Sequence, residues 1–170
     1  MRLVAVDYAS VLPDLMAQLA SPGLLLVVPD EQRPANVMTI GWALFGRVWS
    51  RPICTVLVRP SRYTFGLINR AGVFTVNRMP EGFERAVNRC GTVSGRTVDK
   101  IAEQGWTVAR GETVDAPYLA EAALHLECRV VLTGEVTDRL DAELLANCYP
   151  RGDLHTVYYG LVTGVFRHEP

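Results

Sequence analysis

The chain has 170 residues, of which 49% are hydrophobic and 21% are charged, and its formal net charge is −1. This length and composition are ordinary for a globular protein with its own core, so we predict one domain over residues 1–170. The nearly balanced charge gives no electrostatic reason to expect a nucleic-acid or membrane partner. The longest apolar run, residues 23–28, is far too short to span a bilayer.

The four cysteines, Cys54, Cys90, Cys128 and Cys148, are widely spaced and form no CxxC pair. Structural zinc sites usually need closely spaced ligand pairs, so we expect no metal. Residues 1–10 lack the basic and apolar segments of a signal peptide. We therefore expect a cytoplasmic protein whose thiols are reduced.

In the first part of the chain, the pattern predicts a helix over residues 12–20 followed by strands. Ser10 precedes this helix, Asp14 sits in its first turn and Gly23 follows it, which are plausible start and stop signals. A buried strand is expected next, then a polar turn, broken strand structure and another short strand. Their residues are 23–28, 29–34, 37–48 (broken near Gly41 or Gly46) and 54–58.

The rest of the chain is expected to alternate short helices with strands. Helices are predicted over residues 61–70, 80–90, 98–104 and 141–147, with Gly72 ending the first and Pro80 in the first turn of the second. Strands are predicted over residues 73–77, 122–136 and 155–166. In the first of these, Phe74 and Val76 share one face.

These elements predict a mainly β (α+β) fold. Many strands at irregular spacing, with short helices between them and no regular βαβ alternation, favour an antiparallel, Greek-key-like barrel with peripheral helices. No GxGxxG motif follows a predicted strand, and no P-loop pattern is present. A Rossmann-type dinucleotide site is therefore excluded.

Residues 59–64, Arg-Pro-Ser-Arg-Tyr-Thr, follow an apolar strand and open a predicted helix. Pro60 discourages continuation of the strand, and Ser61 can cap the helix. Arg59 and Arg62 add charge where a helix N-terminus presents free N–H groups, and Thr64 adds a hydroxyl. This combination predicts a phosphate cradle. The alternative is an ordinary capped helix with solvated arginines.

Residues 36–42 mix polar and apolar side chains in a manner that suits a flat ligand. Asn36 and Thr39 offer polar atoms, and Gly41 would let the backbone approach a ring closely. The alternative is a barrel strand whose Met38 and Ile40 face the core.

Residues 90–100 contain two glycines and several hydroxyls, which indicates a tight loop entering a helix. Such a loop could close over a ligand. Asp99 beside Lys100 is more typical of a solvated surface than of a catalytic pair. Cys90 is open to two interpretations, a reactive thiol or the more usual buried, inert one.

Among the histidines, His155 lies where a turn enters the last predicted strand, so its imidazole could contact a flavin edge or a nicotinamide. The alternative is a strand-end histidine that bonds to backbone. His168, near the end of the sequence, is expected to be exposed. No nucleophile, base and acid line up as a hydrolytic triad.

Taken in order, these stretches resemble the flavin reductase-like family that includes the flavoredoxins. The resemblance runs from about residue 23 to residue 165. It is carried by residues 34–42, 59–64, 74–77, 90–91 with 94–96 and 99–100, and 155–156 with 159–160.

The resemblance implies a split β-barrel that binds FMN between the two subunits of a homodimer. It assigns the FMN phosphate to the motif that contains Arg59, Ser61, Arg62, Tyr63 and Thr64. It assigns the ring and ribityl chain to Asn36, Met38, Thr39, Ile40 and Gly41. The loop with Ser94 and Gly95, up to Lys100, would lie near the flavin, and His155 near the redox site.

Three functions remain open at this stage. The first is an enzyme in which NADH or NADPH reduces FMN, which then reduces free flavin or another small acceptor. The second is a flavoredoxin-like carrier whose FMN exchanges electrons with a redox partner protein. The third is a split-barrel protein that has lost its flavin, although residues 59–64 argue against it.

Overall fold

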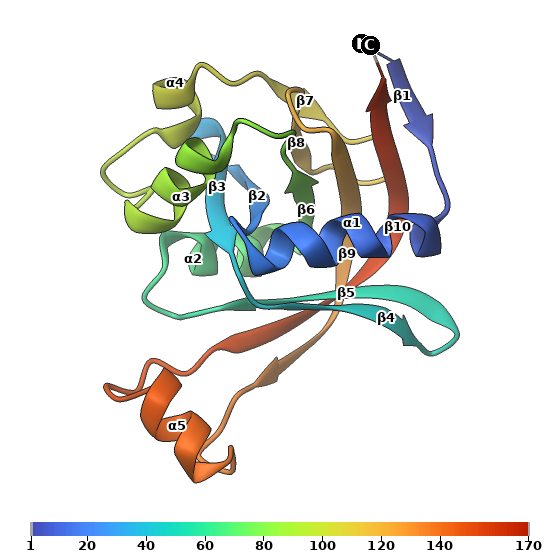
Figure 1. Ribbon diagram of the computed structural model, residues 1–170. Coiled ribbons are helices and arrows are strands. Elements are labelled where there is room, and N and C mark those ends of the chain that lie inside the picture. The colour runs from blue at the N-terminus through green and yellow to red at the C-terminus, as the bar shows by residue number, and fades with distance from the viewer. Residues whose placement is uncertain (1, 170) are drawn as a thin grey trace.

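A computed structural model describes residues 2–169 of the protein (Figure 1). Within these residues the main sheet contains eight strands, and its neighbouring strands run antiparallel. They are β1 (Arg2–Ala5), β2 (Leu24–Asp30), β3 (Arg33–Ile40), β4 (Ala43–Val48), β5 (Arg51–Val58), β6 (Val73–Arg78), β9 (Leu124–Glu135) and β10 (Thr156–Glu169). Their order is β3-β2-β6-β9-β10-β5-β4, and β1 pairs with β10.

The sheet has to curl, because its two end strands are neighbours in the chain. Six spacings of about 4.8 Å would separate β3 from β4 in a flat sheet, roughly 29 Å in all. Only Gly41 and Trp42 link them, and this link spans no more than about 11 Å. Across residues 2–169 the two strands are not hydrogen-bonded to each other, so the barrel stays open. The predicted antiparallel split barrel is confirmed.

The described part of the chain contains five helices, of which the first four pack around this barrel (Figure 1). The five helices are α1 (Tyr8–Ala20), α2 (Tyr63–Ala71), α3 (Glu84–Thr92), α4 (Lys100–Gln104) and α5 (Ala142–Cys148). α2 and α3 both contact β2 and β3, and α4 contacts β3. α5 lies apart from them, at the tip of an arm made by the far ends of β9 and β10.

Strand β2 is buried on both faces, which explains its continuous apolar run. Leu24, Leu26 and Val28 belong to the cluster that contains Phe74 and Val76, the two residues predicted to share a face. Leu25 and Val27 belong to a second cluster, which α3 and α4 help to cover. A strand covered on both sides loses the alternation of polar and apolar residues that an exposed strand shows.

Helix α1 begins earlier than the sequence indicated. The carboxylate of Asp7 accepts hydrogen bonds from the backbone N–H groups of Ala9 and Ser10, so Asp7 is the cap and the helix begins at Tyr8. Asp14 therefore lies beyond the first turn, where it pairs with Arg167 at 3.4 Å. Ser10 was the wrong start signal because a better acceptor stood one turn before it.

Other boundaries moved for similar local reasons. Helix α3 begins at Glu84, so Pro80 lies outside it. The polar turn shrinks to residues 31–32, because β2 and β3 continue their pairing to Asp30 and Arg33. β1 and the small sheet of β7 (Val108–Arg110) and β8 (Pro117–Leu119) were not predicted, because these strands are too short to show a clear period.

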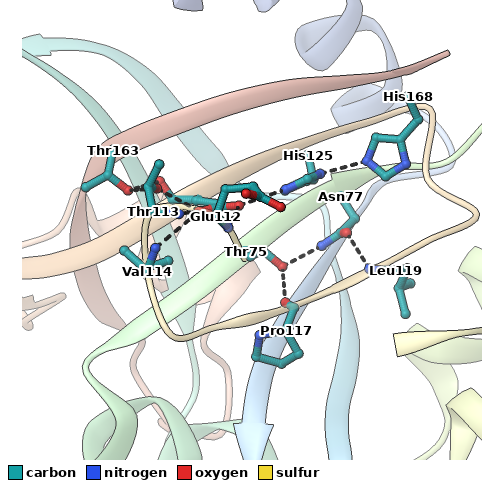
Figure 2. Close-up of polar contacts among 11 residues, drawn as sticks. Thr75, Asn77, Glu112, Thr113, Val114, Pro117, Leu119, His125, Thr163 and His168 are labelled. Carbon is teal, nitrogen blue, oxygen red and sulfur yellow. Dashed lines mark hydrogen bonds and ion pairs between the residues drawn. The ribbon is translucent and has the colours of Figure 1, made fainter. Parts of the chain in front are cut away.

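A buried polar network joins β9 to a loop and to the end of β10 (Figure 2). The Glu127 carboxylate, fully buried, accepts hydrogen bonds from the backbone N–H groups of Glu112 and Thr113, from the Thr113 hydroxyl, and contacts Nε2 of His125 at 3.1 Å. Nδ1 of His125 lies 2.7 Å from Nε2 of His168. His168 is thus partly buried and hydrogen-bonded, so the expectation that it is exposed was wrong.

This network stabilises the native state through the charge of Glu127. Burial alone would raise the pKa of this carboxyl, but hydrogen bonds from His125, Thr113 and the backbone outweigh burial and lower the pKa to about 2. The folded pKa lies below the ordinary value of 4.5. The stabilisation is therefore complete above that value and is lost as the pH falls toward 2.

We predict that Glu127→Gln lowers the free energy of unfolding at pH 7 by roughly 2–4 kcal/mol, because several buried donors lose a charged acceptor. At pH 3 the difference from the parent protein should be smaller, since part of the stabilisation is already lost there. Urea denaturation at both pH values measures this. Glu112→Gln, at an exposed neighbour, is the control, and equal losses in the two variants would contradict the assignment.

Candidate functional site

Two adjoining surface hollows lie beside the start of α2. The basic hollow has a volume of about 180 Å³ and is lined by Met38, Thr39, Ser61, Arg62, Tyr63, Thr64, Cys90, Gly91, Val93, Ser94, Gly95, Arg96 and Lys100. The aromatic hollow has a volume of about 190 Å³ and is lined by Met38, Thr39, Ile40, Gly41, Trp42, Leu57, Arg59, Arg62 and His155. Met38, Thr39 and Arg62 line both, so the two hollows are parts of one elongated site.

The basic hollow collects positive charge without a carboxylate to balance it. Arg62, Arg96 and Lys100 line it, and no aspartate or glutamate of residues 2–169 does. Lys100 is only 4% exposed, and its ammonium group donates to the carbonyl oxygens of Cys90 and Val93 at 3.1 and 3.4 Å. Burial lowers the pKa of Lys100, and the nearby Arg62 acts in the same direction. The expectation of a solvated Asp99–Lys100 pair was wrong for Lys100.

Helix α2 begins at Tyr63, with Arg62 as its N-cap and no side-chain cap at this end of the described helix. Ser61, the predicted cap, is used elsewhere: its hydroxyl donates to the Asp153 carboxylate at 2.6 Å. The first N–H groups of a helix have no partner within the helix and carry the positive end of its dipole. This end of α2 therefore offers donors to an anion in the basic hollow.

The loop at residues 94–96 closes one side of the basic hollow, and it needs glycine at its centre. A Cβ on Gly95 would lie 2.2 Å from Oδ1 of Asn36 and 2.9 Å from Cδ1 of Tyr63. Asn36 is buried and donates to the hydroxyl of Thr64 at 2.8 Å. Asn36 thus lies behind the wall of the site, where it fixes Thr64, and only a residue without a side chain lets the loop pack this closely.

The wall of the aromatic hollow comes from the end of β3 and the link to β4, from the end of β5, and from His155 just before β10. Met38, Ile40 and Leu57 supply apolar surface, and the ring of Trp42 lies 5.0 Å from that of His155. Trp42 is 45% exposed, which is unusual for a tryptophan inside a core but expected on the rim of a binding site. The hollow thus suits a flat, largely apolar group.

Arg59 holds the segment between α5 and β10 against this rim. Its guanidinium donates to the carbonyl oxygens of Cys148 and Asp153 at 2.9 and 3.1 Å. It also lies 4.8 Å from the centre of the Tyr149 ring. Arg59 therefore borders the site but is engaged with the chain itself. The guanidinium of Arg62, in contrast, has no hydrogen-bond or ion-pair partner within residues 2–169, and it lines both hollows.

His155 is neutral at physiological pH. Burial and the positive charge of Arg59 and Arg62 lower its pKa to about 4, although Asp153 acts in the opposite direction. Its Nδ1 atom lies 2.7 Å from the hydroxyl oxygen of Tyr149. The imidazole can therefore donate or accept a hydrogen bond at the hollow, but it carries no charge there.

The structure brings together nearly all of the residues that the sequence singled out. Of the predicted site residues, those in one or both hollows are Met38, Thr39, Ile40, Gly41, Arg59, Ser61, Arg62, Tyr63, Thr64, Ser94, Gly95, Lys100 and His155, and Asn36 lies directly behind. Trp42, Arg96 and Tyr149 are among the residues at the site that were not predicted, as is Leu57. The first two stood inside the quoted motifs, but no sequence signal marked Tyr149.

Other groups offer no alternative chemistry at this site. Burial raises the pKa of the Cys90 thiol to about 11, which leaves it protonated and inert near neutrality. Over residues 2–169 no cluster of three or more histidine, cysteine or acidic residues has a metal-binding arrangement. In the same range, none of the helices has the length and apolar character needed to cross a membrane. A larger surface hollow of about 850 Å³, between α3 and α4, contains none of the predicted site residues.

Comparison with known proteins identifies the family. The model of the flavin reductase like domain matches residues 16–170, so the chain belongs to that family. It is similar in structure to a flavoredoxin from Methanosarcina acetivorans, with a TM-score of 0.70 and 30% identity, over 87% of this chain and 69% of that one. It is also similar to an FMN-binding protein from Thermus thermophilus, with a TM-score of 0.66 and 26% identity, over 85% of this chain and 68% of that one.

Among curated relatives, an uncharacterised protein of Archaeoglobus fulgidus is 33% identical over 113 residues, which is 66% of this chain and 63% of the relative. The chain spans less than two thirds of the length of the curated relatives that it matches.

Proposed function

We propose that the protein binds FMN in the two adjoining hollows and uses it for electron transfer. The proposal is supported mainly by one observation: the basic hollow joins the apolar and aromatic hollow. No carboxylate of residues 2–169 lines the basic hollow. FMN has the matching form, since a flat ring system is joined through a short polar chain to a phosphate. The name of the Thermus thermophilus neighbour, an FMN-binding protein, supports the same ligand.

The phosphate fits the basic hollow. Arg62 and Arg96 can donate to its oxygens in a planar fork, and the ammonium of Lys100 would gain the negative partner that it lacks in the chain alone. The hydroxyls of Thr64 and Ser94 and the N-terminal N–H groups of α2 provide further donors. Tyr63 is placed by its own hydroxyl, which donates to Asp30 at 3.1 Å.

The ring fits the aromatic hollow. Met38, Ile40, Gly41 and Leu57 would line its faces and edge, together with Thr39, while Asn36 would support the phosphate side of the site through Thr64. When bound, FMN can accept a hydride and pass on electrons singly or in pairs. The protein's own residues would bind and orient the cofactor and offer the neutral imidazole of His155 at its edge.

The two remaining candidates for the reaction differ in the electron donor. In the first, NADH or NADPH reduces the bound FMN, which reduces a free flavin or another small acceptor. In the second, the protein is an electron carrier that exchanges electrons with a partner protein, and the likeness to a flavoredoxin supports this alternative. We favour the reductase, because the chain belongs to the flavin reductase like domain family.

The proposal includes a homodimer that completes the site. Each hollow alone is below the ~300–1,000 Å³ typical of small-molecule pockets, and both are open to solvent. Large apolar side chains are exposed on β4, the β4–β5 turn and the projecting arm: Leu44, Val48, Trp49, Val131, Leu132 and Leu144. An exposed apolar surface of this kind favours association with a second copy.

We predict that Arg62→Ala weakens FMN binding by roughly 10- to 150-fold, the equivalent of one charged hydrogen-bonding group at about 1.5–3 kcal/mol. Quenching of FMN fluorescence on titration measures the affinity. Arg51→Ala, at an exposed arginine in β5 away from the hollows, is the control. Unchanged affinity in the Arg62 variant would refute the phosphate assignment.

The donor can be identified by adding NADH and then NADPH to the FMN-loaded protein without oxygen. We predict that one of them bleaches the visible absorption bands of bound FMN. Flavin that binds but stays oxidised with both would favour the electron carrier. A protein that takes up no FMN at all would overturn the proposed function.

Dimerisation is tested by sedimentation velocity with and without FMN. We predict a dimer, because the exposed apolar residues on β4 and the arm need a partner. Leu44→Lys, which places a charge on this surface, should shift the species toward monomer. A monomer that still binds FMN at full affinity would contradict the shared site.

A further inference from the structure

The segment between α5 and β10 brings two side chains, Tyr149 and His155, together at the edge of the site. Tyr149 ends α5 as its C-cap residue, and His155 directly precedes β10. The two side chains meet at the rim of the aromatic hollow, where the Tyr149 hydroxyl oxygen lies 2.7 Å from Nδ1 of His155. Only His155 of the two lines the hollow itself.

Tyr149 is held in place from the other side. Its side chain is only 7% exposed, the Arg59 guanidinium lies over its ring, and its ring centre is 6.3 Å from that of Trp42. The same arginine donates to the Cys148 carbonyl, next to Tyr149 in the chain. The hydroxyl therefore faces His155 from a fixed support.

The chemistry of the pair decides which atom carries the proton. A neutral imidazole has one N–H and one bare nitrogen, and the hydrogen bond at one nitrogen fixes the role of the other. A phenol is a stronger acid than a neutral imidazole N–H, and an imidazole nitrogen is a stronger base than a phenol oxygen. The favoured bond is thus from the Tyr149 O–H to Nδ1, which leaves the hydrogen of the ring on Nε2.

Two further observations agree with this direction. Burial raises the pKa of the Tyr149 hydroxyl, although the positive charge of Arg59 acts in the opposite direction, so the hydroxyl keeps a proton that it can donate. Nε2 of His155 has no hydrogen-bond partner within residues 2–169, and it retains surface accessible to solvent. The ring therefore offers a donor at the hollow that nothing in the chain uses.

We propose that Tyr149 is a positioning residue that locks His155 in the Nε2–H tautomer, so that the imidazole presents a hydrogen-bond donor to a ligand in the aromatic hollow. The proposal rests on the proposed function for the identity of that ligand, a flavin ring with hydrogen-bond acceptors along its edge. The tautomer itself is a property of the protein alone.

The tautomer is tested first in the protein without flavin. Long-range ¹H–¹⁵N spectra of protein labelled with ¹⁵N-histidine distinguish the two neutral tautomers, and His155→Gln identifies the signals of His155. We expect the Nε2–H form at pH 7 in the parent protein. Tyr149→Phe keeps the ring beneath Arg59 but removes the hydroxyl, so the signals should shift toward a mixture of tautomers. Tyr159→Phe, which alters a tyrosine four residues further along the chain whose ring lies beside Trp49, should leave them unchanged.

The second measurement uses the FMN-loaded protein. Tyr149→Phe should alter the visible absorption spectrum of bound FMN, whereas Tyr159→Phe should not. An Nδ1–H tautomer in the parent protein, or His155 signals that are the same in Tyr149→Phe, would overturn the proposal. Failure of the parent protein to bind FMN would refute the proposed function instead, while the tautomer result would stand. A lowered melting temperature would show that Tyr149→Phe is destabilised. In that case the tautomer of His155 in the parent protein alone tests the proposal.

Discussion

The antiparallel pairing of Val58 with Thr156 determines where the candidate site lies. Arg59 directly follows β5 and His155 directly precedes β10, so the register places both residues at the same end of the barrel. On the other side of β5, Ala43 pairs with Val56, which places Trp42 at the same end. A shift of one residue in either register would turn every side chain to the opposite face. The position of the site therefore depends on the pairing of these strands. That pairing is stabilised by the hydrophobic core and not by the site residues.

The charge of the basic hollow follows from that scaffold. The link between β5 and α2 carries Arg62, and α3 leads into the loop with Arg96 and into Lys100, so three elements converge on one point. Placing a lysine that is 4% exposed beside two arginines costs free energy in the chain alone. An anionic ligand would offset that cost on binding, whereas the Glu127 carboxylate finds its hydrogen-bond donors within the chain. The Glu127 network is thus complete within the described chain, whereas the basic hollow lacks a negative partner there.

Much of the fold and of the site could be predicted from the sequence, because local signals were strong there. The apolar run of β2, the left-handed Gly72 that ends α2 and the basic stretch at residues 59–64 are each visible in a few consecutive residues. Long-range partners were not visible. Ser61 was predicted to cap a helix, but its hydroxyl donates a hydrogen bond to Asp153, which is 92 residues away in the sequence. Tyr149 gave no signal, since its role exists only once Arg59 and His155 are brought beside it.

The engagement of Arg59 changes how substitutions at this motif should be interpreted. Arg59 and Arg62 are equivalent in a sequence motif, but Arg59 donates to the Cys148 and Asp153 carbonyls and supports Tyr149. Removal of the Arg59 side chain would free the segment that positions His155. It would also remove any contact between Arg59 and a phosphate. A loss of flavin affinity in an Arg59 variant would therefore combine two effects. Arg62, whose side chain has no partner in the described chain and lines both hollows, reports on the ligand alone.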